Sequence, residues 1–290
     1  MGALGAGLGL GAGLAWAVAQ VLMKVGLASM SRPWFAFLRT LLALVFVLPY
    51  GLLSGGFAFG SVGVVGIAVV GGTLNAFAGT ALFYYAIRRS PVHVAVSLTG
   101  SGPFWGVLTA SLFLGEALSA RTIGAALAVV CGASLLVSPR GASSEERRPL
   151  ALLAALATAV LWGFTTAVPA KYCLSAGMTP ITYQLVMVVS AGACWGVWAL
   201  RATLRSDHRF TARGVWAAAA SSFTGFFLGW ILWLSALKVA PASLVSPLSG
   251  STTLFAFFLG VALFRERPTW RAVAGALLVV GGVLLVSAFA

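Results

Sequence analysis

The 290-residue sequence is poor in charge, and above all in acidic residues. Only 8% of its residues are charged, with 5 Asp and Glu against 18 Lys and Arg. Soluble domains contain about 25% charged residues. A chain that is 60% hydrophobic, with a mean hydropathy of +1.03, cannot cover a water-exposed surface. The composition excludes a soluble globular protein and predicts an integral membrane protein.

The sequence also lacks the residue groups that enzyme, metal and nucleotide sites require. Cys131, Cys173 and Cys194 have no metal-ligand spacing, and the two histidines lie outside the helix interiors, His93 at a helix edge and His208 in a loop. No phosphate-binding G-x-x-x-x-G-K-[ST] loop occurs. The basic residues are not interleaved with aromatic residues as in single-stranded nucleic-acid sites. We therefore expect no catalytic residue, metal or other cofactor, no ATP site and no nucleic-acid partner.

Long apolar runs account for most of the chain. A spanning helix needs about 20 apolar residues, whereas a strand of a membrane barrel would alternate apolar with polar residues. The runs therefore predict an all-α membrane protein with ten transmembrane helices. They cover residues 4–28, 34–54, 61–87, 92–114, 119–138, 150–172, 179–200, 214–237, 242–264 and 269–289.

An internal duplication relates the two halves of the chain. The polar linker 139–149 separates a repeat at 1–138 from a second at 150–290, each with five predicted helices. When residues 77–138 are shifted by 150 positions, about 16 of 62 match. The matches include Gly79/Gly229, Pro91/Pro241, Gly100/Gly250, Ser101/Ser251 and Glu116/Glu266. A repeat with an odd number of spans is followed by an upside-down copy, and such inverted repeats are typical of secondary transporters.

The sequence resembles the EamA family of the drug/metabolite transporter superfamily. The resemblance is carried by LAW at 14–16, LGE at 114–116, LWG at 161–163 and RER at 265–267, together with ten helices in two repeats. Arg39, in FLRTLLAL, is similar to an arginine that this family often carries in its second helix. The resemblance implies a transporter of small metabolites, often an exporter of amino acids or related compounds, with both termini in the cytoplasm.

Loop charges predict the opposite orientation. Loops after odd-numbered spans contain thirteen arginines, and loops after even-numbered spans contain three basic residues, Arg121, Lys171 and Lys238. Positive loops face the cytoplasm, so the count places both termini in the periplasm. We expect a multi-pass protein of the bacterial inner membrane, embedded in the lipid bilayer as a monomer or homodimer.

Polar and aromatic residues inside the spans are the candidates for a substrate site. Trp16 and Gln20 share a helix face, as do Trp162 and Thr166, and this places an aromatic and a polar group at similar depths in both repeats. The predicted substrate-binding set is Trp16, Gln20, Asn75, Tyr84, Ser101, Trp105, Trp162, Thr166, Trp230 and Ser251. Further charge contacts are predicted for Arg39, Lys24 and Lys171. The alternative role of these residues is helix packing or interfacial anchoring.

The leading functional hypothesis is a secondary transporter that moves a small neutral or zwitterionic metabolite, such as an amino acid, outward by alternating access. No carboxylate lies within a span, and this disfavours a proton-coupled multidrug exporter. One alternative is a transporter of an organic cation, such as a quaternary amine held by cation–π contacts. Another is a translocase for a lipid phosphate or lipid-linked sugar.

Overall fold

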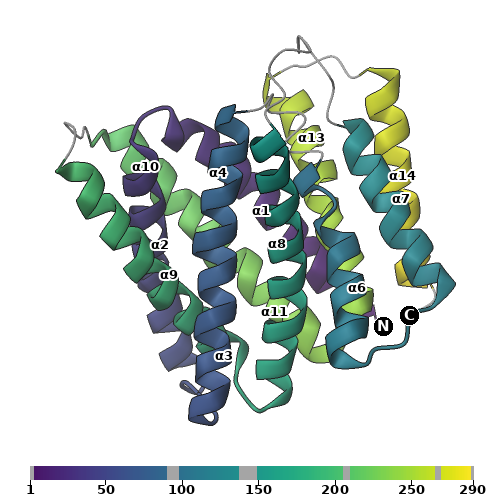
Figure 1. Cartoon of the computed structure of the whole chain (residues 1–290), viewed down its shortest axis with the longest axis horizontal. Helices are drawn as coiled ribbons and strands as arrows, with labels where there is room; N and C mark the ends of the chain where they lie inside the picture. The colour runs from purple at the N-terminus through teal and green to yellow at the C-terminus, as the bar shows by residue number, and fades with distance from the viewer. Residues whose placement is uncertain (1–2, 90–97, 137–148, 205–209, 265–268, 289–290) are drawn as a thin grey trace.

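The computed structural model describes residues 3–89, 98–136, 149–204, 210–264 and 269–288, and these residues form helices and no β-strand (Figure 1). The first half contains α1 (Ala3–Leu27), α2 (Arg32–Leu53), α3 (Val62–Thr73), the π-helix η1 (Leu74–Gly79), α4 (Thr80–Arg89), α6 (Gly102–Leu114) and α7 (Ala120–Leu136). The second half contains α8 (Pro149–Ser175), α9 (Pro180–Thr203), α10 (Ala212–Ser221), the π-helix η3 (Ser222–Gly229), α11 (Trp230–Val239), α12 (Ala242–Val245), the 3₁₀ segment η4 (Ser246–Gly250), α13 (Ser251–Phe264) and α14 (Trp270–Ala288).

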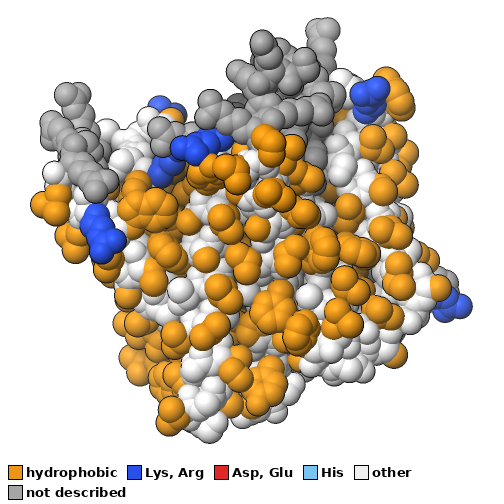
Figure 2. All heavy atoms as spheres, viewed as in Figure 1, with side chains coloured by type: hydrophobic (Ala, Val, Ile, Leu, Met, Phe, Trp, Pro, Cys, Tyr) orange, Lys and Arg blue, Asp and Glu red, His pale blue; other side chains and the backbone are white. Residues whose placement is uncertain are grey.

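The described chain is a multi-pass membrane protein by the length and apolarity of its helices. Seven helices are long and apolar enough to span a bilayer. The runs predicted at 92–114, 119–138 and 269–289 correspond to shorter apolar helices at Gly102–Leu114, Ala120–Leu135 and Trp270–Leu285. Hydrophobic side chains cover the middle of the bundle in Figure 2, and Lys and Arg side chains lie towards its ends. This distribution matches an apolar membrane layer between two aqueous faces.

Local signals explain where several helices begin and end. The Ser61 and Thr211 side chains accept hydrogen bonds from backbone N–H groups three residues later, at the starts of α3 and α10. Pro33 and Pro180 occupy the first turns of α2 and α9, where a missing N–H costs nothing. Gly115 ends α6 with a φ of 68°, a conformation that favours glycine.

The first helix of each half packs in the other half. Helix α1 contacts α10, η3, α11 and α13, and makes few contacts with its sequence neighbour α2. Helix α8 likewise packs against α3, η1, α4 and α6. Helices α2 and α9, the second of each half, pack against each other. The two halves are therefore intertwined.

Helices α7 and α14 form a close, reciprocal pair. A Cβ atom added at Gly132 would lie 2.6 Å from the carbonyl oxygen of Gly275, and one at Gly282 would lie 2.8 Å from that of Ala125. The two contacts are related by the 150-residue shift found in the sequence. Glycines allow this close approach of two helix backbones, and the reciprocity is what a two-fold relationship between the halves produces.

Several residues named from the repeat and from the loop charges lie outside the residues that the structure describes. Pro91 and Glu266 fall outside the described ranges, as do Arg140, Arg147, Arg148, Arg205, Arg209, Arg265 and Arg267. The backbone of Lys24 is described within α1, whereas its side chain is not. The predicted charge contact of Lys24 therefore lies outside the described part of the chain.

Candidate functional site

Two π-helices lie at equivalent places in the two halves. Helices η1 and η3 interrupt the segments α3–α4 and α10–α11, and end at Gly79 and Gly229, which match in the repeat. A π-helix is one widened turn in a helix and is frequent at functional sites. Backbone carbonyl groups of both π-helices accept hydrogen bonds from side chains of other helices.

Trp16 and Trp162 each bind the π-helix of the opposite half. The indole Nε1 of Trp16 donates to the carbonyl oxygen of Gly225 at 3.2 Å, and that of Trp162 donates to the carbonyl oxygen of Asn75 at 3.1 Å. Residues 75 and 225 are again 150 positions apart. The sequence pairing of the two tryptophans therefore corresponds to equivalent contacts between the halves.

Glycine makes room for each indole. A Cβ atom at Gly79 would lie 2.6 Å from Nε1 of Trp162, and one at Gly229 would lie 2.6 Å from Nε1 of Trp16. Real Cβ atoms do not approach a ring so closely. Both contacts therefore require glycine, and the matching Gly79/Gly229 pair in the sequence reflects this requirement.

Helix α9 supplies two further donors that the sequence analysis did not select. Nε1 of Trp195 donates to the carbonyl oxygen of Ala76 at 2.9 Å, and Nε2 of Gln184 donates to the carbonyl oxygens of Phe226 and Phe227. Both side chains are buried. A glutamine within the apolar run 179–200 was a usable signal, since buried polar groups in a membrane must find partners.

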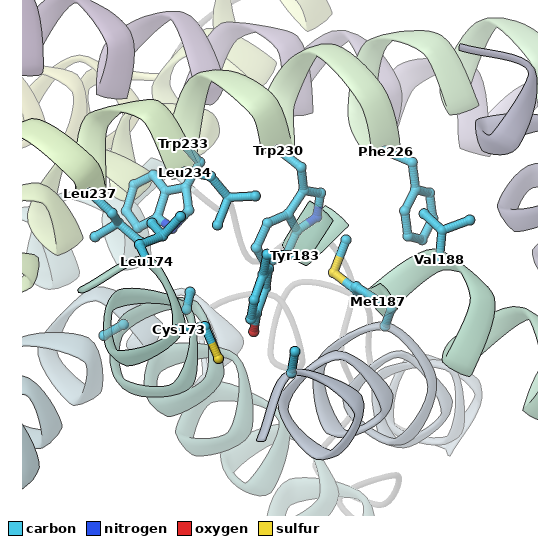
Figure 3. Packing of buried hydrophobic residues seen from close by; sticks show 14 of the residues in the cluster. Cys173, Leu174, Tyr183, Met187, Val188, Phe226, Trp230, Trp233, Leu234 and Leu237 are labelled. Carbon is cyan, nitrogen blue, oxygen red and sulfur yellow. The ribbon is translucent and has the colours of Figure 1, made fainter. Parts of the chain in front are cut away.

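Aromatic rings fill the space between the halves. The Trp16 ring centre lies 5.9 Å from that of Trp230 and 5.4 Å from that of Trp233. Figure 3 shows Tyr183 and Met187 of α9 facing Trp230 and Phe226 across the core. Trp162 packs against Phe83, with ring centres 5.3 Å apart. The predicted residues Trp16 and Trp230 are therefore brought together, while Trp162 lies in the equivalent position of the other half.

The other half-buried or buried candidates are held by hydrogen bonds. The amide Nδ2 of buried Asn75 donates to Oγ1 of Thr165 at 2.7 Å. The Thr166 hydroxyl donates to the carbonyl of Trp162, and its own carbonyl accepts from Nε1 of Trp233 at 3.0 Å. The Asn75 contact joins the two halves, and the Trp233 contact joins α11 to α8 within the second half.

Ser101, Trp105 and Ser251 lie at the starts of α6 and α13. Nε1 of Trp105 donates to Oγ of Ser101 at 3.2 Å, and Oγ of Ser101 donates to the carbonyl of Leu98. Oγ of Ser251 donates to the carbonyl of Leu248, and Ser251 packs against Gly13 of α1. Both hydroxyls donate to carbonyl groups within their own chain segments.

Gln20, Tyr84 and Arg39 have different environments. Gln20 is exposed although Trp16, one turn earlier, is half-buried. Tyr84 is buried, packs its ring against Trp195 and has no partner for its hydroxyl among the described residues. The Arg39 guanidinium carbon lies 4.5 Å from the centre of the Phe226 ring. Arg39 therefore points into the bundle and not towards the interface.

Lys171 and Glu116 hold the backbone on either side of Pro241. Nζ of Lys171 donates to the carbonyl oxygens of Leu237 and Ala240, at the end of α11, the latter at 2.8 Å. The Glu116 carboxylate accepts from the N–H groups of Ala242 and Ser243 at 2.8 and 2.6 Å, at the start of α12. A cation at a helix C-terminus and an anion at an N-terminus are both favourable. Lys171 is engaged at this break in the helix.

We expect Glu116→Gln to destabilise the protein by about 1–2 kcal/mol. A glutamine oxygen is uncharged and cannot accept both N–H groups as the two carboxylate oxygens do, so one N–H loses its partner. The change is measured as the melting temperature of the purified protein in detergent. Ser175→Ala, at an exposed site near Lys171, is the control. Equal melting temperatures for Glu116→Gln and wild type would contradict the capping role.

The comparisons with known proteins agree with this architecture. The model of the EamA-like transporter family matches residues 3–138 and 149–288. An uncharacterized transporter of Archaeoglobus fulgidus is 25% identical over 280 residues, which are 96% of each chain. A protein of known crystal structure has the same fold, with a TM-score of 0.83 and 19% identity over 99% of this chain and 97% of its own. The chain belongs to the EamA-like transporter family.

Proposed function

We propose that this transporter is a secondary carrier that moves a small neutral or zwitterionic metabolite, an amino acid or a related compound, outward by alternating access. The reciprocal contact of Trp16 with η3 and of Trp162 with η1 carries the proposal. Each half reaches the widened turn of the other through the same residue type and an equivalent carbonyl. Equivalent contacts of this kind support a carrier whose two repeats exchange roles between its outward-open and inward-open states.

The finer architecture belongs to the same proposal. We interpret the seven long and three shorter apolar helices as ten spans in two inverted five-helix repeats, 1–138 and 150–290. The antiparallel course of α7 and α14 and the reciprocal Gly132 and Gly282 contacts support an inverted relationship. In such a fold the substrate site lies near the midplane, between the repeats.

The polar side chains of the candidate lining favour a substrate without net charge. Glu116 is the only acidic residue in the described ranges, and it caps α12. The candidate lining is aromatic, amide and hydroxyl in character, from Trp16, Tyr84, Gln184 and Trp230. Such a lining orients a ligand by hydrogen bonds and by contact with ring faces.

The tryptophan cluster favours a second candidate, an organic cation such as a quaternary amine. The ring centres of Trp230 and Trp233 each lie within 6 Å of that of Trp16, and the faces of these rings could contact a cation. The guanidinium of Arg39, close to Trp16 through their shared neighbour Gly225, would repel it. This repulsion places the organic cation second.

Loop charges support an orientation in which both termini face the periplasm of a bacterial inner membrane. The termini lie at the same end of the bundle in Figure 1, and Lys and Arg side chains are seen mainly towards the opposite end in Figure 2. A basic end of a bundle faces the cytoplasm. Transport towards the termini would then be export.

The function is tested by a ligand panel followed by a transport assay. The purified protein is heated in detergent with amino acids, quaternary amines, nucleosides and phosphorylated metabolites. A ligand at about 100 times its dissociation constant stabilises by roughly 2.7 kcal/mol. We expect stabilisation only by amino acids or close analogues, and counterflow exchange of the same compound in proteoliposomes.

Other results of this panel would replace the proposal. Stabilisation confined to quaternary amines would favour the second candidate. Stabilisation confined to phosphorylated compounds would favour a translocase for a lipid phosphate or lipid-linked sugar. Binding of an amino acid without counterflow exchange would contradict alternating-access transport of that compound.

A further inference from the structure

Arg39 is a charged residue in the interior of the bundle. It lies seven residues after the first residue of α2, Arg32, about 10 Å along the helix at 1.5 Å per residue. Its guanidinium does not extend to the helix end. It stacks on the ring of Phe226, and its Nη2 would lie 2.7 Å from a Cβ added at Gly225. The absence of a side chain on Gly225 provides the space for this group.

No described residue neutralises Arg39. Its Nε is buried and has no hydrogen-bond partner in the described ranges, and the only described carboxylate, that of Glu116, is bound to α12. A buried, uncompensated charge costs several kcal/mol. A half-buried charge that has no counter-ion among the described residues points to a ligand that supplies the missing negative charge.

Other buried polar atoms also lack a hydrogen-bond partner among the described residues. Gln184 donates to the carbonyl of Phe226 through Nε2, and its Oε1 is buried without a partner. Ser222, one turn before Phe226 in η3, has an unpartnered buried hydroxyl. The buried hydroxyl of Tyr84 also lacks a partner. These groups include both donors and an acceptor.

We propose that Arg39 binds a carboxylate of the transported substrate, so that the substrate class is a zwitterion with a carboxylate and an ammonium group. This inference rests on the proposed transport function and assigns its substrate chemistry. The planar guanidinium matches a carboxylate with two parallel hydrogen bonds. The ammonium group then has the Gln184 oxygen and the faces of the nearby tryptophans as partners.

A second arginine lies on the same face of α2 as Arg39. Arg32 is exposed at the start of the helix, two turns away. Its positive charge adds to the attraction of an anionic group towards this face.

Pairs of compounds that differ only in the carboxylate test this assignment. The purified wild-type protein is titrated with L-leucine and L-leucinol, L-phenylalanine and L-phenylalaninol, and glycine betaine and choline, with inorganic phosphate as a second anion. Affinity is measured from the shift in melting temperature. In each pair that binds, we expect the carboxylate member to bind about 10–100-fold more tightly, as expected for a lost hydrogen bond to a charged group.

Arg39→Gln and Arg39→Lys separate substrate binding from a structural role. We expect Arg39→Gln to lose the preference for the carboxylate member, and Arg39→Lys to keep part of it. Without ligand, the melting temperature of Arg39→Gln should equal or exceed that of wild type, because an uncompensated buried charge has been removed. The comparison of compound pairs on the wild-type protein remains decisive if a variant does not fold.

Several outcomes would overturn the assignment of Arg39 while leaving the transport proposal intact. These are equal affinity for both members of a pair that is exchanged in proteoliposomes, unchanged affinity in Arg39→Gln, and tighter binding of phosphate than of any carboxylate. Absence of binding and exchange for every compound of the panel would overturn the transport proposal, and the assignment of Arg39 with it.

Discussion

Trp16→Phe and Trp162→Phe should each slow transport at least about tenfold while the protein stays folded. Phenylalanine keeps an aromatic ring in place and removes the N–H that donates to Gly225 or Asn75. An interhelical hydrogen bond in a membrane contributes about 0.6–2 kcal/mol, so the loss in stability is small. The contact couples the two halves, so either substitution should impair their exchange between outward-open and inward-open states.

Alanine at the same positions should abolish transport. Trp16→Ala also removes the ring that packs between Trp230 and Trp233, and large-to-small substitutions in a core cost about 3–5 kcal/mol. Exchange is measured in proteoliposomes with the compound identified by the ligand panel, and folding by size-exclusion chromatography and melting temperature. Trp216→Phe, at an exposed position in α10, is the matched control and should transport as wild type does.

The two phenylalanine variants show whether the indole N–H groups have a role in transport or only in helix packing. If both exchange substrate at the wild-type rate, the indole N–H groups serve only to pack the helices. If only one is impaired, the two halves do not contribute equally, and the site belongs to one of them.

Gly163→Ala should cause the largest loss of stability, about 3 kcal/mol or more. The new Cβ would lie 2.5 Å from the carbonyl oxygen of Gly102 and 2.8 Å from the backbone nitrogen of Gly106, both in α6. Overpacking typically costs about 1–3 kcal/mol, and here the obstacle is backbone that no side-chain rotation can move. Helices α6 and α8 would have to separate.

The matched control is Gly66→Ala in α3. A Cβ at Gly66 meets no atom within 4 Å, and alanine is favoured over glycine in a helix by about 1 kcal/mol. Its melting temperature should equal or exceed that of wild type, whereas Gly163→Ala should melt earlier and give less folded protein. A Gly163→Ala protein as stable as Gly66→Ala would mean that α6 and α8 are not in close contact.

Much of the site was indicated by the repeat. The match of Trp16 with Trp162 and of Gly79 with Gly229 identified four residues that form equivalent contacts in the two halves. The π-helices themselves were not predicted, because a widened turn has the same apolar composition as an ordinary one. Trp195 was missed because its partner is a backbone carbonyl and because, unlike Trp16 and Trp162, it was not paired with a tryptophan of the other half.

The sequence by itself determined that this protein is helical and lies in the membrane. Its apolar runs are long enough to span a bilayer, and it has too few charged residues to be stable in water. Its internal repeat also indicated a two-part transporter. The tertiary structure alone decided which helices meet. Helices α1 and α8 cross into the opposite halves, and Arg39 points at Phe226 and not at the interface. In a chain that is apolar on every face, hydropathy does not specify partners. Close contacts at glycines and hydrogen bonds to single carbonyls select them, and these depend on positions in space.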